Sequence, residues 1–322
     1  RPPGYKQVDW TFPIKYKKLR WEKPTPGTKA LINIINEYRP DIIYSLHNSS
    51  FTGVYYYISR PLTKKLYKLL QETPLNLGLP LHMEPENPNV EVFARGIFKT
   101  ISIEDEYNFL EKHLRGKSPA DVLSIGGSSI DYAKRIKPGV FGMICEVPYI
   151  YDPRMFDETP LGISKKDLWT TSIERAKRAL GEVEKFYTRL DPTESNPFKE
   201  CVEYYLKFMS GRLEAEAKWV KTSKELLRPA TIADTTRYLA GTIWYELLIH
   251  GTLYRMAMYE FEFYGRLRAK SLARSILRRA KKAYKEFMEL ANIRVVPIRR
   301  LIVVQLAAIM NTAKHLSRSR AT

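Results

Sequence analysis

Two short apolar runs constrain the fold more than any other feature of the chain. They are residues 41–47 (DIIYSLH) and residues 140–147 (VFGMICEV), and neither alternates regularly between apolar and polar positions. Continuous apolar runs of this length are typical of strands that are buried on both faces of a sheet. Such sheets need helices on both sides, so the two runs predict an α/β fold.

Helical patterns flank the two runs. Residues 28–39 carry apolar positions at helical spacing and stop before a proline, because the residue preceding a proline is pushed out of the α region. A second helix is expected from Pro61, and a third after Ser164, which has the spacing of a capping box with Asp167. Residues 51–58, rich in valine and tyrosine, are expected to form an adjoining strand. We therefore expect a mixed sheet flanked by helices.

A change of pattern near residue 190 divides the chain. Residues 191–197 (DPTESNP) place two prolines among polar residues between two helical patterns, which is typical of a linker. The longer patterns beyond this segment are all helical. We expect residues 1–190 to form the α/β domain and residues 191–322 to form an all-helical C-terminal module.

Positive charge is concentrated in the last part of the chain. Lys and Arg number 53 against 35 acidic residues, a formal net charge of +18, and residues 261–322 alone contain 15 Lys and Arg against three Glu. A basic helix over residues 266–285 suits phosphates or an anionic membrane, but it also fits a solvated helix face packed by its leucines. The charge allows nucleic acid or a membrane surface as a partner, and we do not favour either.

Cysteine content and hydropathy indicate in which cellular compartment the protein is expected. Two cysteines, Cys145 and Cys201, are too few for a disulfide framework or a cysteine-based zinc site. The longest apolar stretch, residues 301–310, is too short to cross a bilayer, so we expect a soluble, cytoplasmic protein. The chain starts at Arg1 rather than methionine, within a loop-like Pro-Pro-Gly context, and we expect further sequence upstream.

Each apolar run ends in a side chain capable of chemistry. His47 is at the end of the first run, although a histidine in such a place is more often a hydrogen-bonded structural residue than a metal ligand. Glu146 is near the end of the second, where burial would raise its pKa towards the range useful for a general base. The alternative is that Glu146 emerges at the sheet edge and pairs with a Lys or Arg.

Both residues fall in a pattern that resembles the zinc carboxypeptidases of the carboxypeptidase A type. Residues 40–53 (PDIIYSLHNSSFTG) resemble the segment in which a strand ends in the third zinc-binding histidine, and residues 124–132 (SIGGSSIDY) resemble the Gly-Gly-Ser-x-Asp-aromatic stretch with one extra residue. Glu146 follows Asp131 at nearly the sequence separation that the family has between its motif Asp and its glutamate. The resemblance covers residues 1–185 and implies the C-terminal part of a carboxypeptidase-like catalytic domain.

The resemblance also implies a reaction. His47 would be one ligand of a catalytic zinc ion (Zn²⁺), and Glu146 would be the catalytic glutamate that takes a proton from the zinc-bound water and passes it to the leaving amine. The substrates would be the C-termini of peptides or proteins, from which the enzyme would remove the last residue.

The chain departs from this family in three places. The His-x-x-Glu motif that supplies the first two ligands is absent, because none of the five histidines is followed by Glu at the third position. The Asn-Arg pair for the substrate carboxylate is also absent, and Val122 replaces the mobile tyrosine. We therefore expect the distal part of an enzyme whose N-terminal part is supplied separately. The alternatives are a catalytically inactive carboxypeptidase-like binding protein and an anionic-polymer binder acting through the helical module.

Overall fold

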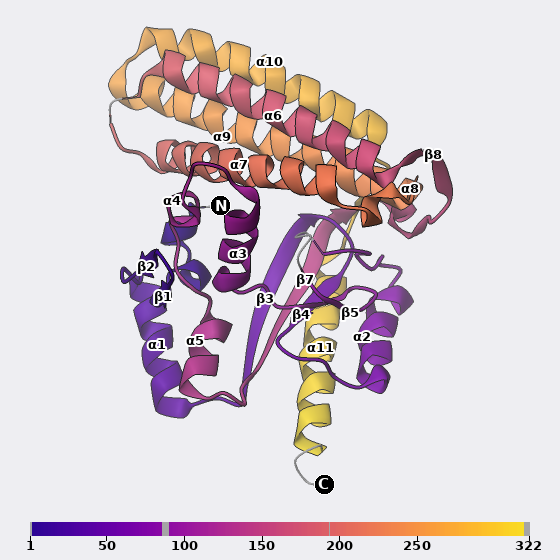
Figure 1. Ribbon diagram of the computed structural model, residues 1–322. Coiled ribbons are helices and arrows are strands. Elements are labelled where there is room, and N and C mark those ends of the chain that lie inside the picture. The colour runs from indigo at the N-terminus through magenta and orange to yellow at the C-terminus, as the bar shows by residue number, and fades with distance from the viewer. Residues whose placement is uncertain (1, 86–89, 193, 319–322) are drawn as a thin grey trace.

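The computed structural model describes residues 2–85, 90–192 and 194–318. Within these ranges a mixed six-stranded sheet has helices on both faces, and a group of long helices lies above one end of the strands (Figure 1). This arrangement confirms the expected α/β class and the helical C-terminal region.

Parallel pairing of two long strands forms the centre of the sheet. Strand β3 runs parallel to β7 from the pair Ile42 and Phe141 to the pair Phe51 and Ile150, and β4 pairs antiparallel with the other edge of β7. The strands of the sheet are β3 (Ile42–Phe51), β4 (Tyr55–Ile58), β5 (Val92–Ala94), β6 (Ile97–Lys99), β7 (Phe141–Tyr151) and β10 (Arg294–Val295). Two small sheets pair β1 (Ile14–Tyr16) with β2 (Leu19–Trp21) and β8 (Pro160–Ser164) with β9 (Pro229–Thr231).

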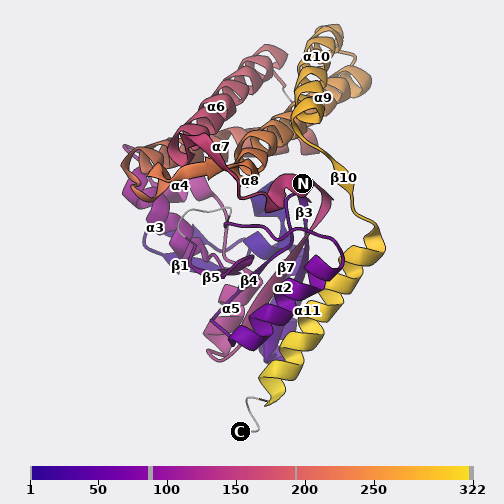
Figure 2. The same cartoon turned by 90° about the vertical axis from the view of Figure 1, so that its right-hand side faces the viewer.

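Helices cover the two faces of the sheet (Figures 1 and 2). Alternate residues of β7, including Met143 and Cys145, pack against α2 and α11, whereas α1 and α5 lie on the opposite face. The α-helices are α1 (Pro26–Tyr38), α2 (Lys64–Asn76), α3 (Ile103–His113), α4 (Pro119–Leu123), α5 (Ser129–Ile136), α6 (Lys165–Leu190), α7 (Pro197–Thr222), α8 (Ile232–Thr235), α9 (Gly241–Tyr264), α10 (Leu267–Leu290) and α11 (Ile298–Arg318). Short 3-10 turns include η2 (Val8–Trp10) and η3 (Pro153–Phe156), and η5 (Thr236–Ala240) is a π-helical turn.

Local sequence signals explain several helix boundaries. Thr25 caps α1, and its hydroxyl accepts a hydrogen bond from the Thr28 N–H, while Ser164 and Asp167 form the expected capping box of α6. The helix after Pro61 begins three residues later than expected, at Lys64. Gly265, whose φ is 66°, ends α9.

The packing does not divide the chain at the expected boundary between residues 190 and 191. Helix α6 packs with α7, α9 and α10 through a core that includes Val183, Leu253 and Ile276. Helix α11 instead returns to the sheet, where Leu301 and Val304 join the core beneath β7. The sheet domain therefore includes the last helix, and the helical group includes α6.

The expected strand ends at His47 and Glu146 are wrong. Both strands continue for four residues or more, because β3 and β7 stay paired as far as Phe51 and Ile150. Phe51 then packs edge-to-face on Phe287 of α10, with ring centroids 5.1 Å apart. His47 and Glu146 therefore lie within the length of their strands and not at the strand ends. No helix in the described ranges is long and apolar enough to cross a membrane.

Candidate functional site

The strand register brings His47 and Glu146 together. They are directly opposite each other on β3 and β7, so their side chains leave the same face of the sheet. The Nδ1 atom of His47 lies 3.0 Å from Oε1 of Glu146. Two residues 99 positions apart, singled out on sequence grounds, thus form one hydrogen-bonded pair, and the partner of Glu146 is a histidine and not the Lys or Arg of the alternative interpretation.

Asp9 completes the pair from the other side of the imidazole. Its Oδ2 atom lies 3.7 Å from Nε2 of His47. The turn η2 carries Asp9 to this place, and Ser129, at the start of α5, contributes to lowering the pKa of its carboxyl. Sequence reasoning missed Asp9, because the segment around it has no periodic pattern and reaches the site only through tertiary packing.

The Gly-Gly motif positions this segment. The N–H groups of Gly126 and Gly127 donate to the carbonyl oxygens of Trp10 and Phe12. A Cβ atom on Gly126 would collide with the Phe12 carbonyl, so only glycine allows the two chains to approach so closely. Residues 124–132 therefore contribute to the site by holding Asp9 beside His47.

The two carboxylates change the protonation of His47. The carboxylate of Asp9 and then the hydrogen bond to Glu146 raise the pKa of His47 to about 9, although burial acts in the opposite direction. Burial alone would raise the pKa of Asp9, but His47 and Ser129 hold it below its usual value. The raised pKa favours the imidazolium form of His47 at neutral pH.

One carboxylate oxygen of Glu146 makes no hydrogen bond within the described residues. The residue is buried, with 8% of its surface exposed, and within the described residues its Oε2 atom has no hydrogen-bond partner. A buried carboxylate oxygen without a partner is costly, and such atoms are commonly found where a water, ion or substrate binds. Within the described residues, Oε2 of Glu146 is therefore a buried hydrogen-bond acceptor that the fold does not use.

The described residues do not complete a zinc site. Within them, no group of three His, Cys, Asp or Glu side chains is arranged to hold a metal ion. A catalytic zinc needs three protein ligands, and with Glu146 reserved as the base only His47 remains as a ligand on this face. Asp9 lies beyond the far nitrogen of the ring, where it can orient the imidazole as carboxylates beside metal-binding histidines do.

A second polar cluster lies where the helical group meets the sheet domain. Lys165, 1% exposed at the start of α6, forms ion pairs with Glu84 and, at 2.8 Å, with Asp234. Burial opposes ionisation of Glu84, yet Arg237 and Lys165 lower its pKa to about 2. The cluster borders a cavity of about 320 Å³ that is also lined by His82, whose pKa falls to about 3 through burial. It fixes α6 and η5 to the loop after α2.

The expected basic helix is α10. Leu272 and Ile276 pack into the helical core, and the Lys and Arg residues occupy the outer side. Some of them are ion-paired within the chain, such as Arg279 with Glu182. This packing agrees with a solvated helix face that is anchored by its leucines.

Comparison with known proteins gives no relative. No family model matches the chain, and no curated protein or solved structure matches it either.

Proposed function

We propose that this chain is the distal part of a zinc-dependent metallocarboxypeptidase. In this proposal His47 is one zinc ligand, Glu146 is the general base, and the reaction removes C-terminal residues from peptides or proteins. The observation that carries the proposal is the 3.0 Å contact between His47 and Glu146. Both residues lie in the segments that carry the family resemblance, and they are hydrogen-bonded although 99 residues separate them, which supports the proposal.

The surroundings of the pair support these roles. Bound zinc would polarise the scissile carbonyl and acidify a water. The unpartnered Oε2 of Glu146 is the proton acceptor that this chemistry requires, and its buried position keeps the carboxylate away from bulk water. Asp9 holds the far nitrogen of His47 and thereby fixes the orientation of the ring.

The remaining ligands come from another polypeptide segment in this proposal. The five histidines of the chain include no His-x-x-Glu motif, and the described residues contain no complete ligand group. The partner is the N-terminal part of the domain, supplied by sequence outside this chain.

The test is to measure zinc content and peptide hydrolysis for the chain alone and for the chain mixed with the polypeptide encoded directly upstream. Glu146→Gln keeps the shape of the side chain and removes the base, while Glu22→Gln changes a surface glutamate that is 64% exposed and serves as the matched control. We expect stoichiometric zinc and hydrolysis in the mixture, loss of hydrolysis in Glu146→Gln, and normal activity in Glu22→Gln. Absence of both zinc and hydrolysis from the mixture would refute the proposal.

Two other functions give different results in the same experiment. A catalytically inactive binding relative would bind peptide C-termini without zinc and without hydrolysis. An anionic-polymer binder would retain nucleic acid or anionic vesicles through α10, where the described residues provide no ion-pair partner for Arg268, Arg274 or Lys281. That binding would weaken steeply with added salt.

A further inference from the structure

Positive charge on α10 has no acidic counterpart over most of the helix. Residues 267–285 (LRAKSLARSILRRAKKAYK) contain Lys or Arg at eight positions and neither Asp nor Glu. Because an α-helix has 3.6 residues per turn, side chains three or four positions apart share one side of it. Five of the eight follow this spacing, and all five are exposed. We call them the basic stripe: Lys270, Arg274, Arg278, Lys281 and Lys285.

The packing of α10 turns the basic stripe towards solvent. On the opposite side of the helix, Leu272 and Ile276 are 4% and 0% exposed and pack into the core shared with α6 and α9. Figures 1 and 2 show α10 at the outer margin of the helical group. At a rise of about 1.5 Å per residue, the stripe extends for about 22 Å, with neighbouring cations about 6 Å apart along the axis. The fold therefore presents a row of cations to the solvent.

Acidic side chains of the chain leave most of the basic stripe uncompensated. Lys285 lies 3.8 Å from Glu289, but both side chains are largely exposed, and such a pair is weak in water. Across the residues that the structure describes, no ion pair is recorded for the other four members of the stripe. Lys270 lies over the ring of Phe261, 4.5 Å from its centroid, which leaves the charge of the lysine in place.

The stability of the helix alone does not explain the basic stripe. Its members lie three or four residues apart, and like charges at this spacing destabilise a helix. The first turn of α10 also contains Arg268 and no acidic residue, although the positive end of the helix dipole favours anions there. A bound polyanion offsets both sources of repulsion. The arrangement is therefore suited to binding an anionic polymer, at some cost to the stability of the free chain.

The apolar residues of α10 favour nucleic acid over a membrane as that polyanion. A helix that lies on a membrane buries an apolar face among the lipids. The apolar face of α10 is already buried in the helical group, where Leu272 and Ile276 pack. A membrane would therefore meet the charges of the stripe without an apolar face to insert.

An exposed aromatic ring adjoins the basic stripe. Tyr284 is 54% exposed and follows Lys281 by three residues, so the two side chains are neighbours on the helix surface. Surfaces that bind single strands combine cations, which follow the phosphates, with aromatic rings on which the bases stack. The bases of a duplex already stack on one another. The ring therefore favours a single strand over a duplex.

We propose that the basic stripe and Tyr284 form a binding surface for single-stranded nucleic acid. The phosphates lie along the stripe, and a base stacks on the tyrosine ring. Cations and a ring face carry no preference for a particular base, so the binding tolerates any sequence. This surface is separate from the pair of His47 and Glu146, and it does not depend on the proposed function.

Fluorescence anisotropy with labelled oligonucleotides tests the proposal on the full chain in EDTA. The probes are an oligothymidylate and an oligouridylate of about 16 nucleotides, and a DNA duplex of the same length. The logarithm of the association constant should fall with the logarithm of the salt concentration at a slope of about −3.5, because each of five phosphate contacts contributes about −0.7. Binding of either single strand with this slope supports the proposal and shows whether DNA or RNA binds more tightly. The duplex should bind at least about fivefold more weakly, because its bases cannot stack on the ring.

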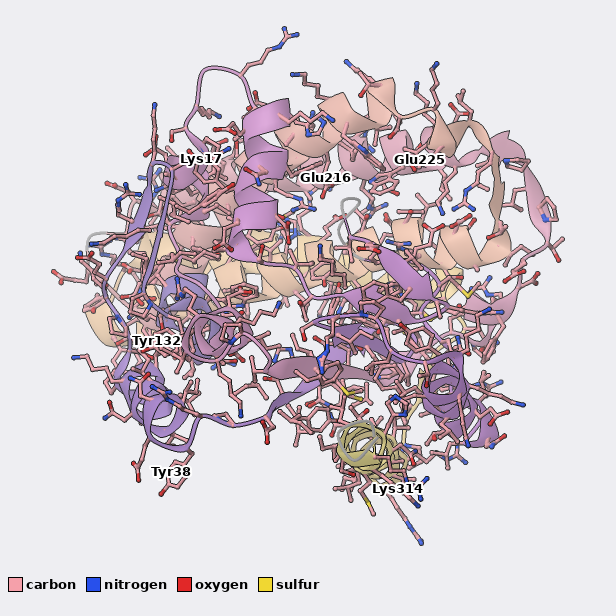
Figure 3. All side chains as sticks on the ribbon, turned by 60° about the horizontal axis from the view of Figure 1, so that its bottom comes forward. Lys17, Tyr38, Tyr132, Glu216, Glu225 and Lys314 are labelled. Atoms are coloured by element: carbon pink, nitrogen blue, oxygen red, sulfur yellow. The ribbon has the colours of Figure 1, made fainter. Side chains whose placement is uncertain are left out.

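Two charge substitutions and a matched control locate the surface. Arg274→Gln combined with Lys281→Gln should weaken binding about tenfold at about 0.15 M salt and change the slope to about −2. The melting temperature should stay unchanged or rise, because repulsion within α10 is relieved. The control combines Lys64→Gln with Lys314→Gln, which removes the same charge from exposed lysines of the sheet domain and should leave binding unchanged. Figure 3 shows Lys314 projecting near the end of α11, on the side of the molecule that is turned away from α10 in Figure 1.

Substitutions of Tyr284 separate stacking from charge. Tyr284→Leu should weaken binding at least about fivefold without changing the salt slope, whereas Tyr284→Phe keeps the ring and should bind like the unmodified chain. Circular dichroism verifies that each variant is folded.

Several results would overturn the proposal. They are absence of binding by both single strands at about 0.05 M salt, unchanged binding by the double variant of Arg274 and Lys281, and a duplex that binds as tightly as the single strands. Retention by vesicles of phosphatidylcholine and phosphatidylserine, without binding of oligonucleotides, would make a membrane the partner instead. Because EDTA is present throughout, failure of the zinc-dependent function leaves these results unchanged, and the two proposals can fail separately.

Discussion

Replacing His47 by glutamine in the metal-free protein tests the charge state of the candidate site. The imidazolium lies between two carboxylates that raise its pKa from 6.5 to about 9. A group whose pKa is higher in the folded than in the unfolded protein stabilises the fold. Its contribution is full below pH 6.5, where the group is protonated in both the folded and the unfolded state. The contribution declines as the pH rises and is lost through pH 9.

The size of the His47 pKa shift determines how much the free energy of unfolding changes with pH. At about 1.4 kcal/mol per pKa unit, a rise from 6.5 to about 9 corresponds to roughly 3 kcal/mol. The His47 side chain is 30% exposed, and solvent screening reduces the expected contribution to roughly 2 kcal/mol. The free energy of unfolding of the natural chain, minus that of His47→Gln, should therefore fall by roughly this amount between pH 6.5 and pH 9.5.

Urea unfolding in EDTA at several pH values gives this difference, and an NMR titration of the His47 ring gives the pKa itself. Asp9→Asn is the informative companion variant, because it should lower the His47 pKa while leaving the histidine in place. A His47 pKa near 6.5, or a stability difference that stays constant from pH 6.5 to 9.5, would refute the reasoning. The result also bears on zinc, because a metal must displace the ring proton, and affinity should rise about tenfold per pH unit below pH 9.

Three further substitutions, one with a matched control, test the packing and its pH dependence. Lys165→Met leaves its two carboxylate partners without their buried cation and should cost roughly 3 to 5 kcal/mol in urea unfolding, whereas Lys285→Met, at a side chain 78% exposed, should cost less than about 1 kcal/mol. Gly142→Ala drives a methyl group into Ile130 and should cost roughly 1 to 3 kcal/mol, with a lowered melting temperature as the readout. The lowered pKa of His82, about 3, makes the fold lose stability as the pH falls below about 6.5, and His82→Gln should flatten that part of the acid unfolding curve.

The sequence was sufficient for the elements whose signals are local. The helix over residues 28–39 and the capping box at Ser164 both depend on neighbouring residues, and both are present in the structure. Residues 84–128 carry no long periodic pattern, yet Ser102 and Asp105 form a capping box that starts α3, a helix of 11 residues. The local signal for this helix is its cap and not its period.

Features that depend on tertiary contacts were beyond the sequence. The residues after His47 are polar, and nothing in Asn48 and Ser49 predicts that pairing with β7 carries the strand onward. The helical period of α11 likewise does not show that this helix joins the sheet core instead of the helical group. Of the candidate site, sequence reasoning provided His47 and Glu146, but Asp9 required the fold.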